Sequence, residues 1–369
     1  MLAWIHAGGD QVSPDAPRVD VVVAVHSPER PIERAVASAL ANRAPLRVTV
    51  VAHNTDPAAI ATRLGARADD PRVRMLALDD GIPSPAGPFN LGLAEATAEF
   101  TSVLGSDDAF EPRAVDAWLA VADRDRASAV VARLRHVGGR AAPTPPTRPF
   151  RRRLDPVRDR LAYRSAPLGL VSRAAFGELR FAEHLPSGED IPYVAAVWYS
   201  GERISYDRRG PGYLVHADAA ERVTHAPMGI AAEFGYLPHV LGSEVLARSE
   251  ASARSALAIK LLRVNLFGAV RNRPEPARWT DAERRALADA AATIISAGGG
   301  IERVLSRRER DLLDAALDPA RPTEALLAAD RRRRARLAPG SLVPRSLGSL
   351  AHREAPIRFS AASALALLR

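Results

Sequence analysis

Two adjacent aspartates, Asp107 and Asp108, follow a buried apolar segment at Phe100–Leu104. Neighbouring carboxylates repel each other and lose hydration when a fold holds them together. A hard divalent cation such as Mg²⁺ or Mn²⁺ relieves this repulsion by bridging them to phosphate oxygens. The pair therefore predicts a metal site. The alternative is a helix cap, because Asp108 or Glu111 stands just before a helix expected to begin near Pro112.

The elements that must position this pair alternate between buried strands and amphipathic helices. Val19–Val25 contains only Asp20 as a polar residue, which is typical of a strand covered on both faces. Behind Pro31, the apolar residues of 32–40 recur with the spacing of one helix face. Further strands are predicted at Leu46–Ala52, Val73–Leu78, Phe100–Leu104 and Ser128–Leu134, and further helices at Leu91–Ala98 and Pro112–Ala122. This pattern predicts an α/β fold with a mostly parallel sheet, whose ligands bind beyond the carboxyl ends of the strands.

The loop after the first predicted strand argues against two common nucleotide-binding folds. Residues 26–31, His-Ser-Pro-Glu-Arg-Pro, contain no glycine for close approach to a dinucleotide pyrophosphate. The sequence also lacks the Gly-x-x-x-x-Gly-Lys-Ser/Thr, Gly-x-Ser-x-Gly and His-Glu-x-x-His motifs. Rossmann oxidoreductases and P-loop NTPases are therefore disfavoured. His26, at the end of the strand, is placed to line a nucleotide pocket.

Four segments, in this order, resemble family 2 glycosyltransferases of the GT-A fold. They are 19–26, 32–40, Asn90–Ala94 and Ser106–Asp108. The similarity runs from about residue 17 to about residue 225 of the chain. It implies a GT-A-type, mostly parallel sheet flanked by helices, and transfer of a sugar from a nucleoside diphosphate to an acceptor hydroxyl with inversion. By the same resemblance the chain divides into an N-terminal extension (1–16), a catalytic domain (17–230) and a mainly helical accessory region (231–369).

The resemblance also implies donor-binding residues. Asp107, together with Asp108, matches the last carboxylate of the family's Asp-x-Asp motif, which ligates the Mn²⁺ or Mg²⁺ ion that holds the donor diphosphate. Gly105 occupies the first position of that motif, a departure that puts the donor contacts in doubt. Asn54 and Asp56 are candidate donor contacts, with an Asx-turn as the equal alternative. Asn90 matches an asparagine of the family's loop before the metal motif.

A second acidic pair, Glu189-Asp190, resembles the family's Glu-Asp motif. The resemblance implies that Asp190 deprotonates the acceptor hydroxyl as general base, with Glu189 orienting it or binding the acceptor. The alternative is a surface turn and helix cap. His216, in a segment similar to the family's late Tyr-x-x-His, is a candidate metal or diphosphate ligand. His225 is a weaker candidate.

The excess of basic residues belongs to the C-terminal third. Residues 1–230 carry 28 basic and 28 acidic side chains, whereas 231–369 carry 23 and 15. Of the 51 basic residues only Lys260 is a lysine, which indicates a compositional bias toward arginine rather than selection for nucleic-acid binding. Helix signals include a start at 280–283, a stop at 297–300 and an amphipathic stretch at Ile301–Ala316.

The segment 259–273 has the make-up of a basic amphipathic helix, which would rest on an anionic membrane, on the catalytic domain or on a second copy in a homo-oligomer. No apolar run approaches the roughly 18 residues of a membrane span, and the chain has no cysteine. We therefore expect a cytoplasmic enzyme, with possible contact at the inner face of the membrane. Its expected partners are a nucleotide-sugar donor and a saccharide or lipid-linked acceptor, and no nucleic acid. The alternatives are a non-catalytic GT-A-like sugar-binding or scaffold protein and, last, a nucleic-acid-binding protein.

Overall fold

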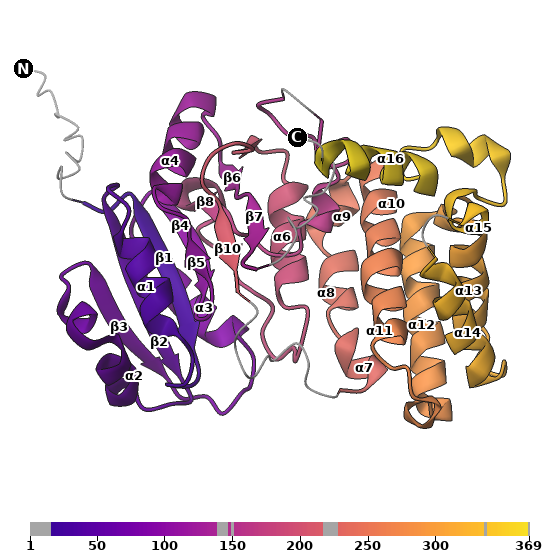
Figure 1. Ribbon diagram of the computed structural model, residues 1–369, viewed down its shortest axis with the longest axis horizontal. Coiled ribbons are helices and arrows are strands. Elements are labelled where there is room, and N and C mark those ends of the chain that lie inside the picture. The colour runs from indigo at the N-terminus through magenta and orange to yellow at the C-terminus, as the bar shows by residue number, and fades with distance from the viewer. Residues whose placement is uncertain (1–15, 139–146, 149–150, 217–227, 336–337, 368–369) are drawn as a thin grey trace, which may run out of the picture.

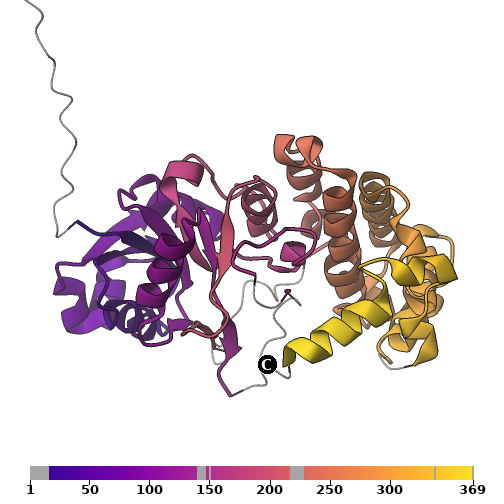
Figure 2. The same cartoon turned by 90° about the horizontal axis from the view of Figure 1, so that it is seen from above.

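The computed structural model describes residues 16–138, 147–148, 151–216, 228–335 and 338–367. A sheet-containing part lies beside a mainly helical part, and the view from above shows the same arrangement (Figures 1 and 2). The last helix, α16 (Pro356–Leu367), lies against the top of the helical part and extends back toward the sheet.

The main sheet has seven strands. Their spatial order is β3 (Val73–Leu78), β2 (Leu46–His53), β1 (Val19–Val25), β4 (Phe100–Gly105), β8 (Gly169–Ser172), β6 (Ala129–Val131) and β9 (Ile204–Tyr206). β1 to β4 are mutually parallel, and β6 is parallel to β9, whereas β8 runs antiparallel to both of its neighbours. The predicted α/β fold with a mostly parallel, GT-A-type sheet is therefore confirmed.

Helices cover both faces of this sheet. In β1 the valines 19, 21, 23 and 25 share one apolar core with α1 (Ile32–Leu40), α2 (Pro57–Leu64) and α4 (Ala114–Asp125). Val22 faces the other way, into a core with α3 (Ala86–Ala94) and α6 (Asp190–Trp198). Side chains alternate along a strand, so a strand buried on both faces needs the continuous apolar run seen at 21–25.

Three short strands form a second sheet beside the carboxyl end of β4. β10 (Tyr213–Val215) pairs antiparallel with β5 (Ala109–Phe110) and parallel with β7 (Leu134–His136). The single strand predicted at Ser128–Leu134 is instead divided between the two sheets. The amide of Ala132 donates to the carbonyl of Leu168, next to β8, but the carbonyl of Arg133 accepts from Tyr213 in β10. The chain therefore changes partner after residue 132.

The helix predicted at Leu91–Ala98 is shifted to Ala86–Ala94. Pro88 occupies its third position, where the backbone amide of a helix has no intrahelical partner and a proline costs little. At the other end, the amides of Thr97 and Ala98 donate to the buried carboxylate of Asp20, at 2.7 and 2.9 Å. These bonds take the place of helical ones, so the helix ends before them.

The remaining short elements of the first part are η1 (Gly65–Asp69), η2 (Leu161–Tyr163) and α5 (Arg173–Phe176). The helical part contains α7 (Ile230–Glu233), α8 (Leu237–Leu241), α9 (Glu244–Arg248), α10 (Ala251–Lys260), the π-helical segment η4 (Leu261–Leu266), α11 (Phe267–Arg271), η5 (Pro276–Arg278), α12 (Asp281–Gly298), η6 (Ile301–Arg303), α13 (Arg307–Leu317), α14 (Thr323–Arg333), α15 (Pro339–Leu342) and η7 (Leu347–Ala351).

The predicted helix signals of this part are confirmed at 280–300. Thr280 caps α12 by accepting a hydrogen bond from the Glu283 amide, and Gly299 ends it in the left-handed conformation. The stretch expected to be one helix at Ile301–Ala316 is instead broken, because Ser306 and Glu309 form a capping box that starts α13.

The apolar face of 259–273 is buried inside the helical part. Ile259, Leu261, Leu262, Leu266, Phe267 and Val270 are all 0% exposed. A helix that rests on a membrane must present its apolar side chains to the lipid. The expected membrane contact through 259–273 is therefore wrong, and this segment is part of the protein's own core.

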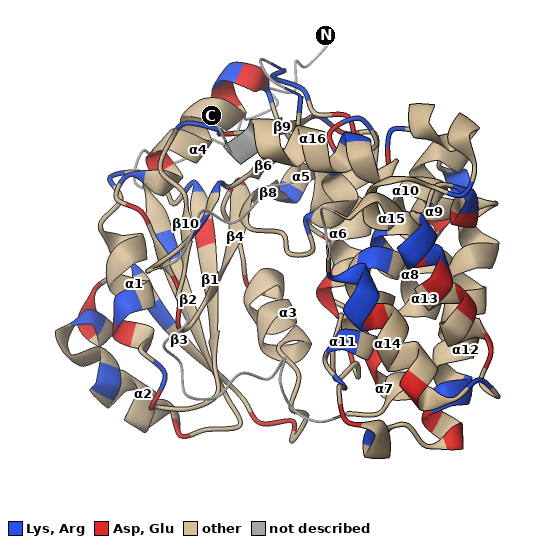
Figure 3. Ribbon diagram, turned by 45° about the vertical axis from the view of Figure 1, so that its right-hand side comes forward, with Lys and Arg blue, Asp and Glu red and all other residues tan. Residues whose placement is uncertain are grey.

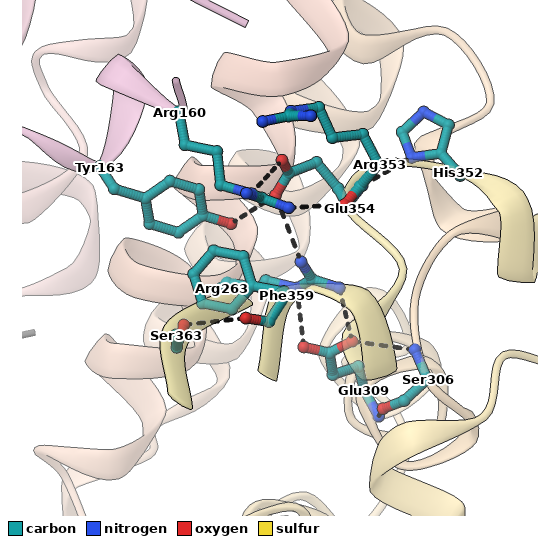
Figure 4. A network of polar contacts seen from close by, with 10 residues as sticks. All are labelled: Arg160, Tyr163, Arg263, Ser306, Glu309, His352, Arg353, Glu354, Phe359 and Ser363. Atoms are coloured by element: carbon teal, nitrogen blue, oxygen red, sulfur yellow. Dashed lines mark hydrogen bonds and ion pairs between the residues drawn. The ribbon is translucent and has the colours of Figure 1, made fainter. Parts of the chain in front are cut away.

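A buried polar network ties the two parts of the molecule together (Figure 4). Arg160 Nε donates to Glu354 Oε1 at 2.9 Å, and both side chains are at most 4% exposed. Arg263 Nε donates to Glu309 Oε1 at 2.8 Å, and its Nη1 lies 3.8 Å from Glu354 Oε2. Segments distant in sequence, before η2, in η4, in α13 and before α16, thus share one set of charges.

Basic and acidic residues are interspersed over the helical part (Figure 3), and several form ion pairs, among them Arg310–Asp314 and Arg345–Asp311. Within the described residues, the structure contains no helix with both the length and the apolar character needed to span a membrane.

Candidate active site

A cavity of about 500 Å³ opens at the carboxyl ends of β1, β2 and β4, beside β10. Five of the residues singled out in the sequence line it together: His26, Asn54, Asp107, Asp108 and His216. They come from four separate segments of the chain. The parallel sheet brings them together, because the carboxyl ends of its strands meet at one edge.

Asp108 fastens the end of β4 to β10. Its Oδ2 accepts a hydrogen bond from the phenol of Tyr213 at 2.7 Å, and its Oδ1 accepts one from the backbone amide of His216 at 2.9 Å. Burial raises the pKa of the Asp108 carboxyl, and these two hydrogen bonds oppose that rise. Asp108 therefore fixes the shape of the cavity wall as well as contributing charge to it.

Asp107 is paired with a guanidinium from the loop after β1. Arg30 Nη2 lies 2.8 Å from Asp107 Oδ1, and Arg30 Nε donates to Ser106 Oγ at 3.2 Å. Arg34, in α1, donates to the backbone carbonyl of Asp107. Both arginine side chains therefore help to hold the Ser106–Asp107 turn at the mouth of the strand.

Gly105, the departure from the family motif, has a physical reason. A Cβ atom at this position would lie 2.9 Å from Asp108 Oδ2 and 3.3 Å from both Asp107 Oδ1 and the Tyr213 phenol oxygen. Its amide also donates to the Tyr213 phenol at 2.9 Å. The two carboxylates thus converge on the space that a side chain at residue 105 would fill.

This arrangement fits a divalent cation that also binds phosphate. Within the described residues, no group of three or more His, Asp or Glu side chains stands ready to hold a metal by itself. Mg²⁺ commonly binds through one or two carboxylates and completes its coordination with substrate phosphates and water. The convergent oxygens of Asp107 and Asp108, with the His216 imidazole on the same cavity, supply that smaller donor set.

Asn54 shapes the opposite wall of the cavity. Its Oδ1 accepts hydrogen bonds from the amides of Asp80 and Gly81, at 3.1 and 2.9 Å. The buried ring of His53 lies 2.9 Å from Asp80 Oδ1 through its Nε2. Asp80 also accepts a hydrogen bond from the Ile82 amide, and this bond, followed by the contact with His53, lowers the pKa of its carboxyl. Asn54 therefore holds the 80–82 loop with the oxygen that was expected to contact the donor.

Asp56 and Asn90 lie outside the lining of this cavity. Asp56 is exposed and caps α2 by accepting from the Ala58 amide at 2.9 Å, the capping alternative of the sequence analysis. Asn90 is buried in α3 and exchanges two hydrogen bonds with the backbone of Phe181, at 2.8 and 3.0 Å. It borders a second cavity, of about 490 Å³, with Arg180 and Glu183. Asn90 therefore positions the segment that leads to Glu189-Asp190.

Asp190 is the first residue of α6 and is only partly exposed. Burial raises its pKa to about 7, repulsion from Glu189 adds to the rise, and the ammonium of Lys260 opposes it. Burial also raises the pKa of Glu189. A carboxyl with a pKa near neutrality is suited to accept a proton at physiological pH. Neither residue belongs to the lining of the 500 Å³ cavity.

Sequence reasoning missed Arg30, Asp80 and Tyr213 as parts of the site. Arg30 stood in the loop used to argue against a dinucleotide fold, and Tyr213 in the segment quoted for His216. Their roles depend on contacts across 77 and 105 positions of the chain, which no local pattern reveals. The weaker candidate His225 lies outside the described residues.

Comparisons with known proteins agree with this geometry. Residues 20–180 match the family model described as glycosyl transferase family 2. No curated protein matched the chain. Among solved structures, S. aureus TarS 1-349 in complex with UDP-GlcNAc superposes with a TM-score of 0.70 at 18% identity, over 86% of this chain and 91% of that one. Its complex with UDP gives 0.69 at 17% identity over the same shares.

The structure of S. aureus TarS that extends beyond residue 349 is matched with a TM-score of 0.67 at 18% identity, over 85% of this chain but 55% of that one. At these identities the shared property is the fold, which includes the helical part as well as the sheet. With the match to the family model, this supports glycosyl transfer. The chain therefore carries, at residues 20–180, a segment that resembles family 2 glycosyltransferases, within a GT-A-like fold continued by a helical region.

Proposed function

We propose that this protein transfers a sugar from a nucleoside diphosphate to an acceptor hydroxyl, with inversion at the anomeric carbon. The observation that carries the proposal is the convergence of Asp107 and Asp108 in a 500 Å³ cavity at the carboxyl edge of the sheet. The match of residues 20–180 to the glycosyltransferase family 2 model supports it. TarS, which shares the fold, has been crystallised with UDP-GlcNAc and with UDP.

In this proposal the donor diphosphate lies beside Asp107, Asp108 and His216, which hold a Mn²⁺ or Mg²⁺ ion. Such an ion neutralises phosphate charge and so stabilises the departing diphosphate. Arg30 is placed next to Asp107 and donates hydrogen bonds to phosphate oxygens, an interaction for which the guanidinium fork is well suited. His26 and Asn54 line the part of the cavity assigned to the nucleoside.

Asp190 acts as general base. It takes the proton of the acceptor hydroxyl while that oxygen forms a bond to the anomeric carbon, and the bond from this carbon to the diphosphate oxygen breaks on the opposite face. The electron pair of the broken bond leaves with the nucleoside diphosphate. Glu189 orients the base or the acceptor. The acceptor is proposed to be a saccharide or a lipid-linked glycan, in bacterial polysaccharide or glycoconjugate assembly on the cytoplasmic side of the membrane.

Calorimetry and turnover together test these assignments. UDP, dTDP and GDP sugars are first screened for thermal stabilisation with and without Mn²⁺, because a bound donor raises the stability of the folded state. We expect Asp107→Ala/Asp108→Ala to abolish cation-dependent donor binding. Asp190→Asn should leave donor binding intact and stop transfer. Asp56→Asn, a change at an exposed helix cap, is the matched control and should preserve both.

Two outcomes would contradict the proposal. Unchanged nucleotide-sugar and cation binding by the double alanine variant would remove the site from this cavity. No heat from the unaltered protein with any nucleoside diphosphate and Mn²⁺ would favour a non-catalytic scaffold of the same fold.

A further inference from the structure

Lys260 is the single lysine of a chain with 51 basic residues, and it is only 1% exposed. It is the last residue of α10, in the helical part. Burying an ammonium group is costly unless another group compensates its charge. In a protein that uses arginine at every other basic position, a buried lysine calls for a local reason.

The surroundings of Lys260 connect it to the Glu189-Asp190 pair. Its neighbours Ile259 and Leu261 belong to the same apolar core as Leu185 and Ile191, which lie on either side of the acidic pair. Tyr236, also in this core, packs against Gly188, where a Cβ atom would lie 2.5 Å from its ring. The ammonium and the carboxylates therefore lie around one apolar layer at the junction of α6, α8 and α10.

The charged and titratable groups that act on Asp190 are few. Glu189 acts on it from the preceding residue and Lys260 from α10, and the Tyr236 phenol, itself acted on by Asp190 and Glu233, packs beside them. For Lys260 the one charged group identified is Asp190. The pair is thus an isolated charge interaction across the junction, surrounded by apolar side chains.

The choice of lysine over arginine has a chemical consequence. A guanidinium stays charged under all accessible conditions and needs several hydrogen-bond acceptors in its plane. An ammonium is a compact charge whose pKa changes readily on burial. Here burial lowers the pKa of Lys260 to about 8, and Asp190 opposes the change. The two groups therefore titrate close to each other, on either side of pH 7.5.

We propose that Lys260 is a positioning residue for the base: from the helical region it keeps Asp190 ionised and directed toward the acceptor side, so that proton acceptance depends on the docked helical region. This inference rests on the proposed role of Asp190. It gives the helical region a specific part in the chemistry, although it contributes no side chain to the 500 Å³ cavity.

The single lysine makes a direct test possible. In protein grown with ¹³Cε-labelled lysine, the full chain has one labelled site, so its NMR titration needs no assignment. We expect a Lys260 pKa of about 8 in the unaltered protein. In Asp190→Asn the pKa should fall by about 1 pH unit, because the favourable carboxylate is gone while the burial remains. An unchanged titration would overturn the pairing.

The second measurement is the pH profile of transfer with the donor identified by the thermal screen. Removing the ammonium disfavours the carboxylate, so Lys260→Met should move the acidic limb of kcat/KM to higher pH by about 1 unit. Lys260→Arg, which keeps the charge, should hold the limb near its original position even where its size lowers kcat. A limb that stays in place in Lys260→Met would contradict the inference.

A matched control separates electrostatics from general loosening of the helical part. Arg284 is 2% exposed in α12 and donates to the carbonyls of Ala315 and Asp318, at 3.0 and 2.8 Å. Arg284→Met should lower stability without moving the acidic limb. If Lys260→Met does not fold, the NMR titration of Asp190→Asn still decides. A lysine pKa that falls in Asp190→Asn while transfer continues would confirm the pairing and refute Asp190 as base.

Discussion

The phenol of Tyr213 joins the end of β4 to β10 by donating to Asp108 Oδ2 at 2.7 Å while it accepts a hydrogen bond from the amide of Gly105 at 2.9 Å. Tyr213 is 2% exposed and packs edge-on against Phe110. One buried hydroxyl group therefore satisfies a carboxylate and a backbone amide at the point where the two acidic side chains converge.

Tyr213→Phe should weaken the site and the fold together. It removes the partner of a buried carboxylate oxygen and of a buried amide, which costs about 1–3 kcal/mol of unfolding free energy. We also expect weaker cation-dependent donor binding, because Asp108 loses the contact that orients it. Urea unfolding and calorimetry with UDP and Mn²⁺ measure the two effects.

Tyr199→Phe is the matched control for that change. Within the described residues, the buried Tyr199 hydroxyl has no hydrogen-bond partner, so its removal should leave stability unchanged or raise it. Equal losses in the two phenylalanine variants would show that the Tyr213 hydrogen bonds carry no special weight.

Restoring the family's first motif aspartate should harm this protein. In Gly105→Asp the new Cβ would meet Asp108 Oδ2 at 2.9 Å, and a third carboxylate would join two that already repel each other. We expect lower stability and weaker binding of UDP with Mn²⁺. Gly105→Ala separates the two causes, since it adds the steric contact without the charge. Tighter nucleotide binding by Gly105→Asp would mean that Asp108 does not replace the missing motif position.

Much of the catalytic fold followed from hydrophobic periodicity alone. Val19–Val25 and Leu46–Ala52 had to be buried strands, and parallel strands had to bring Asn54, Asp107 and His26 to one edge. The same argument failed for Ser128–Leu134, because a strand that passes from one sheet to another has no distinctive local pattern. The start of α3 was hidden by Pro88, which a helix tolerates in its first turn.

The remainder of the site depends on partners that are distant in the sequence. Nothing in the loop 26–31 indicates that Arg30 pairs with Asp107, and nothing near Lys260 indicates a carboxylate across an apolar core. The apolar face of 259–273 predicts burial equally well against lipid or against protein. Only the packing of α12, α13 and α14 on it decides between the two.

The stability of Asp190→Asn should depend on pH in a defined direction. The folded-state pKa of Asp190 is about 7, above the unfolded value of about 3.9, so between these values the folded state binds more protons than the unfolded state. The Asp190 carboxyl therefore costs stability as pH rises through this window. Asparagine has no such cost, so the variant should match the parent near pH 4 and exceed it at pH 7.5, by on the order of 1–4 kcal/mol.

Urea midpoints measured from pH 4 to pH 7.5 check this, since all other titrating groups are shared by the two proteins. A difference that is independent of pH would mean that Asp190 titrates in the folded state as it does in the unfolded chain. Its suitability as a base near neutral pH would then be lost as well.

The network around Glu354 should be the strongest polar link between the helical part and the rest of the chain (Figure 4). Glu354 is 3% exposed and accepts from Arg160 Nε at 2.9 Å and from the Tyr163 phenol at 3.3 Å. Glu354→Gln leaves the buried Arg160 guanidinium without its counter-charge, which should cost about 3–5 kcal/mol of unfolding free energy. Replacing both partners, as in Arg160→Met/Glu354→Met, should cost much less, because no unpaired charge is then buried.

Arg345→Met provides the exposed counterpart of this experiment. Arg345 pairs with Asp311 at 2.8 Å, but both side chains are about half exposed, so its loss should cost about 0–1 kcal/mol. Urea unfolding of the four variants gives the comparison. If Glu354→Gln is no more costly than Arg345→Met, the buried charges do not hold the two parts together. The apolar core shared by α6 and α10 would then be their main connection, because it is the other described contact that spans the junction.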